Sequence, residues 1–146
     1  MKELILFHSI MRWVVFLLLT ASVLTAFNKW LTRKGSSRAD YFLYMFSAIS
    51  FHTQILVGLI LYFLSPKVQF NEHTMKEAVI RFFTVEHGFM MLLAFVMLLT
   101  GRKLAEKTND PTTRHRRYAI WFGIALLLII AAIPWPFRTG LGVGWI

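Results

Sequence analysis

The stretch YFLYMFSAISFHTQILVGLILYFL, residues 41–64, decides the fold of this chain, because it contains no Asp, Glu, Lys or Arg. A helix needs about 20 apolar residues to cross the hydrocarbon core of a bilayer. A backbone in lipid must satisfy its own hydrogen bonds, so this run predicts a membrane-spanning helix rather than a loop or an open strand. Ser65 and Pro66 follow directly and are expected to end that helix.

Three further apolar stretches surround this segment, and we expect spans at about residues 4–27, 41–64, 79–101 and 116–134. The composition agrees, because 57% of the 146 residues are hydrophobic and only 16% are charged. Average soluble domains contain about 25% charged residues, and small soluble domains have too much surface to hide so many apolar side chains. We therefore predict an all-α fold, in which residues 1–146 form a single integral membrane four-helix bundle.

Short polar motifs predict where the second, third and fourth helices begin. A capping box places Ser or Thr three residues before an acidic or amide side chain, and an N-cap Asp is favoured before a proline at the first helical position. Three pairs fit these patterns: Ser37 with Asp40, Thr74 with Glu77, and Asp110 with Pro111.

The formal net charge of +9 is concentrated in two predicted loops, residues 28–40 and 101–117, which hold most of the 16 Lys and Arg residues. By the positive-inside rule, both loops face the cytoplasm and both chain termini lie on the extracytoplasmic side. This topology explains the positive charge without a nucleic acid, so we expect the lipid bilayer and no nucleic acid as a partner. The pattern predicts a multi-pass protein of the bacterial cytoplasmic (inner) membrane.

Few ionisable side chains remain inside the spans once the loops are set aside. Such groups are costly in a membrane, usually face the bundle interior and often mark functional sites. Apart from Arg81, Arg116 and Arg117 at their ends, the spans contain two formal charges and three histidines: Arg12, Glu86, His8, His52 and His87. The other two histidines, His73 and His115, are expected in loops.

The depths of the three span histidines favour a haem site. We expect His8 and His87 to share a layer near the outer third of the membrane, whereas His52 lies closer to the midplane. Two histidines on facing helices can ligate one haem iron axially, and four-helix bundles commonly hold such cofactors. The chain has no cysteine, so imidazole is its main candidate metal ligand. We therefore expect at least two of these histidines to hold a metal or a haem iron.

Other interpretations of these side chains stay open. A histidine in a span can simply donate a hydrogen bond to a neighbouring helix, and Arg12 can form a buried ion pair with Glu86. Glu86, or Gln54 near His52, can instead bind a quinone or carry protons. Methionines three residues after His8 and His87 offer a less favoured Cu(I) site.

Four short segments resemble small bacterial four-helix membrane proteins of the cytochrome b-like class. They are FHSIMRW at residues 7–13, FHTQ at 51–54, VEH at 85–87 and IPWPFR at 133–138. The resemblance implies haem b between the helices, bis-histidine ligation, and electron exchange with quinones or redox partner subunits. It implies His8, His52 and His87 as the candidate ligands, which suffice for one haem but not for two.

The sequence thus favours a membrane cytochrome b-like haem protein that carries electrons within or across the membrane and exchanges them with quinone. The alternative is a haem-free membrane subunit or assembly factor that binds partner proteins, or a second copy of itself, through its helices. A proton- or metal-coupled carrier fits less well, because the inner halves of the spans are nearly all apolar. No set of catalytic residues for hydrolysis can be assembled.

Overall fold

Four long helices account for most of the chain in the computed structural model, which describes residues 1–141 and 144. They are α1 (Lys2–Leu31), α2 (Arg38–Leu64), α4 (His87–Glu106) and α5 (Pro111–Ala132). The short α3 (Ala78–Arg81) and the π-helical η1 (Phe82–Glu86) lead directly into α4, and the short 3₁₀-helix η2 (Thr139–Leu141) follows α5. The described residues contain no strand, which confirms the all-α fold.

Four helical stretches are long and apolar enough to cross a membrane: residues 2–31, 38–64, 78–106 and 111–132. Most extend past the apolar runs of the sequence into the flanking polar residues. This extension is expected physically, because Lys, Arg and Glu are good helix formers and keep their charged ends in the headgroup region. The chain is therefore built as a multi-pass helical membrane protein.

The predicted helix starts are confirmed at α2 and α5. Ser37 Oγ accepts a hydrogen bond from the Asp40 amide (3.2 Å), and the Asp40 carboxylate accepts one from the Ser37 amide (2.7 Å). At α5 the Asp110 carboxylate accepts from the Thr113 amide (2.7 Å), with Pro111 as the first helical residue. These bonds satisfy amide groups that a helix N-terminus would otherwise leave without partners.

The capping box expected at Thr74 and Glu77 is wrong. The Thr74 hydroxyl instead accepts from the Asn71 amide (2.9 Å) and donates to the Gln69 carbonyl (2.7 Å). These bonds close a turn within the segment between α2 and α3, so the hydroxyl is not available for the helix. Helix α3 begins only at Ala78, and no side chain caps it.

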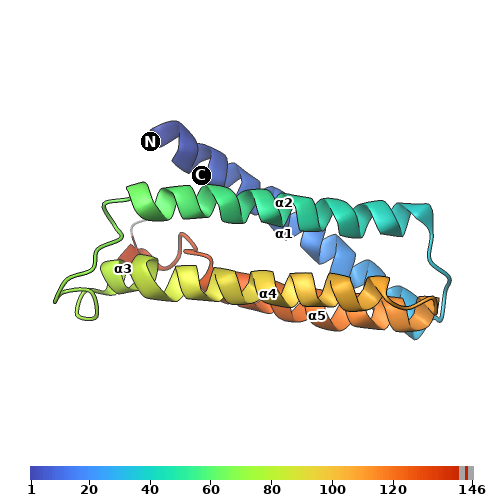
Figure 1. Cartoon of the computed structure of the whole chain (residues 1–146). Helices are drawn as coiled ribbons and strands as arrows, with labels where there is room; N and C mark the ends of the chain where they lie inside the picture. Colours follow the sequence, from blue (N-terminus) through green and yellow to red (C-terminus); the bar gives the residue numbers. More distant parts are fainter. Residues whose placement is uncertain (142–143, 145–146) are drawn as a thin grey trace.

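Helix packing gives the bundle two distinct ends, which can be followed in Figure 1. Helix α5 packs against both α4 and α1, and α1 also packs against α2. The start of α1 and the short helix η2 lie at the left of Figure 1, on the same side as the turn at residues 65–77, and we call this end the terminal end. The loops at residues 32–37 and 107–110 lie at the right, and we call this end the basic end.

The interior of the bundle combines aromatic or leucine side chains with small residues that allow close helix approach. Leu19, Leu98 and Phe122 are fully buried. At Gly101 a Cβ atom would overlap the Cβ of Trp121, so α4 and α5 pack closely there. A short polar bridge also joins α1 to α2, because the hydroxyls of Ser22 and Ser47 lie 2.7 Å apart.

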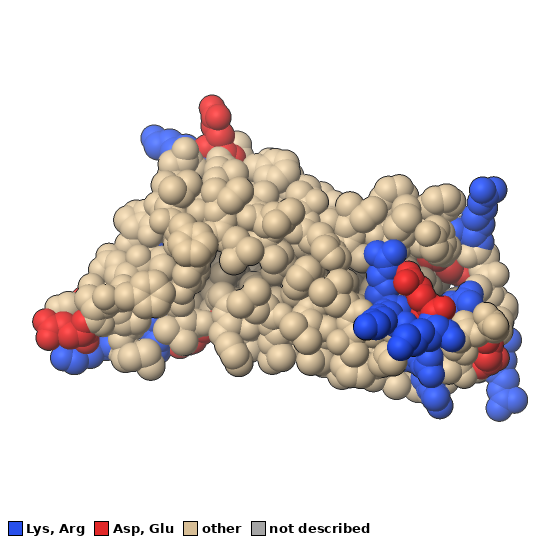
Figure 2. Space-filling model, in the orientation of Figure 1, with Lys and Arg blue, Asp and Glu red and all other residues tan. Residues whose placement is uncertain are grey.

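The surface of the molecule matches a lipid environment. Figure 2 shows a broad band without charged side chains between two charged ends, and Lys and Arg gather at the basic end. Large apolar side chains are exposed along all four long helices, which water would disfavour and lipid accepts. The helices thus have the surface of a bundle that contacts the bilayer.

Candidate functional site

His8 lies on α1 at the terminal end and packs directly against the backbone of α2. A Cβ atom at Gly58 would lie 3.3 Å from His8 Cε1, so the glycine makes room for the imidazole. The Gln54 side-chain amide donates to the His8 main-chain carbonyl (2.9 Å) and fixes α1 against α2. Among the described residues, the buried His8 Nδ1 and Gln54 Oε1 have no hydrogen-bond partner. Buried polar atoms of this kind call for an explanation, since they lose hydration without a replacement.

His87 is oriented by a hydrogen bond to the last residue of α5. Its Nδ1 lies 2.8 Å from the main-chain carbonyl of Ala132, the last residue of α5. A carbonyl only accepts, so Nδ1 carries the proton and Nε2 is left with the free lone pair. This arrangement is the one that metal-ligating histidines commonly show. The ring also packs against Phe82, with the ring centroids 5.8 Å apart.

The π-helix η1 directly precedes His87 and was not predicted from the sequence. Single π-helical turns inside α-helices often occur at functional sites. Its wider turn also aligns residues five apart, which do not face each other in an α-helix. Arg81 and Glu86 are five residues apart and form an ion pair here, with Arg81 Nε 2.7 Å from Glu86 Oε1.

Glu86 forms this ion pair with Arg81 and not the buried pair with Arg12 that the sequence left open. The Glu86 side chain is 47% exposed and directed to its partner on the same helical stretch, rather than to α1. Arg12 instead places its guanidinium carbon 5.4 Å from the centre of the Trp13 ring. Glu86 therefore does not share the interior of the bundle with the histidines.

The structure brings three of the expected site residues together at the terminal end. His8 and His87 lie within electrostatic range of each other, and Arg12 lies within that range of both. Arg12 follows His8 by four residues, so both side chains leave α1 on the same face. We call His8, Arg12 and His87 the histidine site.

His52 lies apart from the histidine site. Its Nδ1 donates to the carbonyl of Ala48 one turn earlier in α2 (2.6 Å), and its ring meets Phe95 of α4 edge-on at 4.7 Å between centroids. Within the described part of the chain, no group of three or more His, Cys, Asp or Glu residues is arranged to hold a metal ion. The three span histidines therefore do not form one common centre.

A crevice of about 340 Å³ adjoins the histidine site on the side of α4 and α5. Ala132, whose carbonyl holds His87, lines it together with Phe82, and its other walls are mostly apolar. Glu86 and Arg138 also line this crevice. It offers an apolar ligand a place close to His87.

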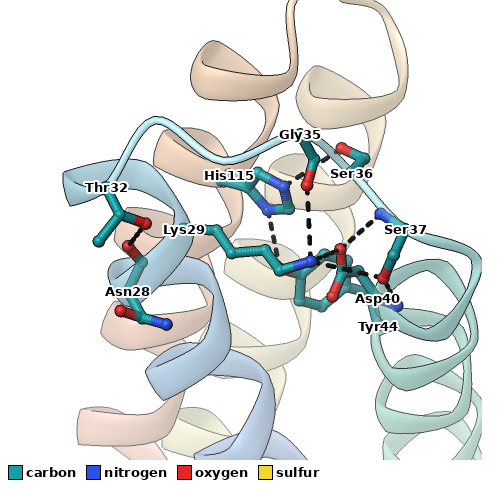
Figure 3. Close-up of polar contacts among 9 residues, drawn as sticks. All are labelled: Asn28, Lys29, Thr32, Gly35, Ser36, Ser37, Asp40, Tyr44 and His115. Carbon is teal, nitrogen blue, oxygen red and sulfur yellow. Dashed lines mark hydrogen bonds and ion pairs between the residues drawn. The ribbon is translucent and has the colours of Figure 1, made fainter.

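The basic end contains a second polar cluster that sequence reasoning missed, shown in Figure 3. His115, expected in a loop, is fully buried in α5. Its Nδ1 lies 3.0 Å from the Tyr44 hydroxyl and its Nε2 lies 3.2 Å from the Ser36 hydroxyl. Beside it, Lys29 forms an ion pair with the buried Asp40.

The signal that could have found His115 was present in the sequence. An N-cap at Asp110 starts the helix at Pro111, which places His115 in the second helical turn rather than in a loop. Its burial then follows from the face on which it lies, one turn before the buried Tyr118 and Ala119.

No protein-family model matches the chain, and no curated protein and no solved structure matches it.

Proposed function

We propose that this chain is a membrane haem protein in which His8 and His87 hold one haem b and which carries electrons within or across the membrane. The observation that carries the proposal is that His8 of α1 and His87 of α4 lie at the same end of the bundle, within electrostatic range of each other. Imidazole is the usual axial ligand of haem b, and a bundle interior is a common place for it.

The residues around the histidine site fit such a group. His87 keeps its Nε2 lone pair free because Nδ1 is held by Ala132, and the buried Nδ1 of His8 has no partner within the described residues. Gly58 lets the His8 ring pack directly against α2, which fixes the position of the imidazole. Arg12 supplies a positive charge on the same face as His8, which suits a haem propionate. When bound, the haem would supply one-electron transfer.

The crevice beside His87 supports quinone as the electron donor or acceptor. Its apolar walls suit the ring of a quinone, and Glu86 on its wall offers a half-exposed carboxylate that can take a proton from a quinol. We propose further that the basic end faces the cytoplasm of a bacterial inner membrane, with both termini outside. The gathering of Lys and Arg at that end supports this orientation.

An optical spectrum tests the haem proposal directly. We expect the full chain, purified in detergent after expression with added haem precursor, to show a Soret band and reduced-minus-oxidised bands of a six-coordinate haem b. His8→Ala and His87→Ala should each remove or change these bands. His52→Ala is the matched control, because His52 is also a half-buried span histidine and lies outside the histidine site.

Two outcomes would contradict the proposal. A well-folded wild-type chain without a Soret band would exclude haem and favour a haem-free subunit that binds partner proteins, including redox subunits or a second copy of the chain. Loss of the band in His52→Ala with retention in His8→Ala would move the haem to a different pair of ligands.

A further inference from the structure

A second crevice, of about 270 Å³, lies at the basic end between the first turns of α2, the end of α4 and the start of α5. Asp40 and Tyr41 contribute from α2, Glu106 from α4, and Arg114 and Tyr118 from α5. It is far along the bundle from the histidine site and has no part in the proposed electron transfer. Its chemistry is polar, unlike that of the crevice beside His87.

The charges that line this crevice leave one cation without a counter-ion. Asp40 is paired with Lys29, and Glu106 Oε1 lies 2.8 Å from Arg102 Nε. Arg114, in contrast, forms no ion pair with any described carboxylate. Both acids are therefore neutralised by bases of their own, and the crevice retains the positive charge of Arg114.

Arg114 also has donor capacity to spare. Its Nη2 donates to the main-chain carbonyl of Thr108 (2.8 Å), which anchors the guanidinium at the start of α5. Its Nε is buried and finds no acceptor among the described residues. Arg114 also lines the crevice, and its guanidinium has five N–H donors, so donors that Thr108 does not use remain for an anion there.

Other groups around the crevice favour an oxyanion. Ser37, Tyr41 and Tyr118 line it, and each carries a hydroxyl group that can donate a hydrogen bond. Helices α2 and α5 both begin here, and the N-terminus of a helix carries a partial positive charge that favours anions.

The position of the crevice along α2 points to the plane of the lipid phosphates. Ser37 precedes the charged Arg38, whereas Tyr41 begins the uncharged run of residues 41–64. The crevice thus lies at the border between the polar loop and the apolar span, where tyrosines often sit. We propose that it binds a phosphate group, with Arg114 as the principal ligand, taken from an anionic phospholipid headgroup or from free phosphate. Basic pockets between helices bind anionic headgroups in this way.

Lipid binding to the full chain in neutral detergent tests this proposal, measured by native mass spectrometry with phosphatidylglycerol and with phosphatidylcholine. We expect phosphatidylglycerol to bind more tightly than phosphatidylcholine. Arg114→Gln should lower the affinity for phosphatidylglycerol about tenfold, because the loss of one hydrogen bond to a charged group typically has an effect of this size. Arg116→Gln is the matched control, because Arg116 has the same charge, lies two residues away on α5 and is exposed. It should keep most of the affinity.

A second variant of the same site should change the lipid affinity in the opposite direction, and this test does not depend on whether Arg114→Gln folds well. Glu106→Gln removes a negative charge from the crevice wall, so it should strengthen phosphatidylglycerol binding.

Inorganic phosphate that displaces the lipid from the wild type, but not from Arg114→Gln, would identify free phosphate as a sufficient ligand. Lack of displacement together with Arg114-dependent lipid binding would identify the headgroup. Equal losses in Arg114→Gln and Arg116→Gln, or no effect of Glu106→Gln, would overturn the proposal.

Discussion

Removal of the Asp40 carboxylate provides a quantitative test of how the basic end is held together. Asp40 is only 5% exposed, pairs with Lys29 of α1 and accepts from the Ser37 amide at the start of α2. In Asp40→Ala the capping bond is lost, which typically costs about 1 kcal/mol. The substitution also leaves the Lys29 ammonium, whose side chain is 19% exposed, without its counter-ion.

The second effect dominates the expected loss of stability. Breaking a fully buried ion pair by removing one partner costs about 3–5 kcal/mol. Because Lys29 keeps some contact with the surroundings and two weaker acceptors in Gly35 and Ser37, we place the total for Asp40→Ala at the low end, about 3 kcal/mol. The free energy of unfolding can be measured by titrating the protein in mixed micelles with sodium dodecyl sulfate and following helix content.

A double substitution separates the ion pair from the cap. Replacing Lys29 by Met in the Asp40→Ala background removes the uncompensated charge, so the double variant should be more stable than Asp40→Ala alone, by about 1–2 kcal/mol. Additive losses from the two substitutions would refute this reasoning, because they would show that the two side chains act independently. The stability lost in each single variant would then come from the helix cap and from side-chain packing rather than from the ion pair.

Three further predictions concern local packing and pH. Gly101→Ala should destabilise the bundle by about 1–3 kcal/mol in the same assay, because the new methyl group overlaps Trp121. Gly58→Val should displace His8 and reduce the reduced-minus-oxidised haem signal, because even a Cβ atom there lies 3.3 Å from the imidazole. Hydrogen bonds from Thr113 hold the pKa of Asp110 below its usual range, so its cap stabilises α5 above the unfolded-state pKa and is lost as pH falls through the folded-state pKa. Helix content near α5 should therefore decline between about pH 5 and about pH 2.

Matched variants make these expectations specific. Gly123→Ala is the control for Gly101, since its nearest neighbour, a Phe27 ring carbon, lies 3.9 Å from the added Cβ. Gly35→Val is the control for Gly58, since nothing lies within 4 Å of its added Cβ. Asp110→Asn should flatten the acid-dependent change. Equal effects in a variant and its control would contradict the steric or electrostatic argument for that position.

The candidate site was predictable only in part. The sequence predicts that His8 and His87 share one layer, and in the structure both lie at the terminal end, within electrostatic range of Arg12. The ion pair between Glu86 and Arg81 was not predictable from the sequence. Residues five apart do not contact each other in an α-helix, and no sequence pattern indicates the π-helix that aligns them. His115 precedes the apolar run, which favoured a loop, but the cap at Asp110 and Pro111 already places it inside the last helix.

The sequence by itself determined that the chain forms four membrane-length helices and where two of them begin. These properties depend on runs of apolar residues and on caps, which act over a few neighbouring positions along the chain. Only the tertiary structure decided which polar side chains meet. The rotation of each helix about its axis and the order of the helices in the bundle depend on close contacts such as Gly58 with His8 and Gly101 with Trp121. Those contacts join residues far apart in the sequence, and no local pattern records them.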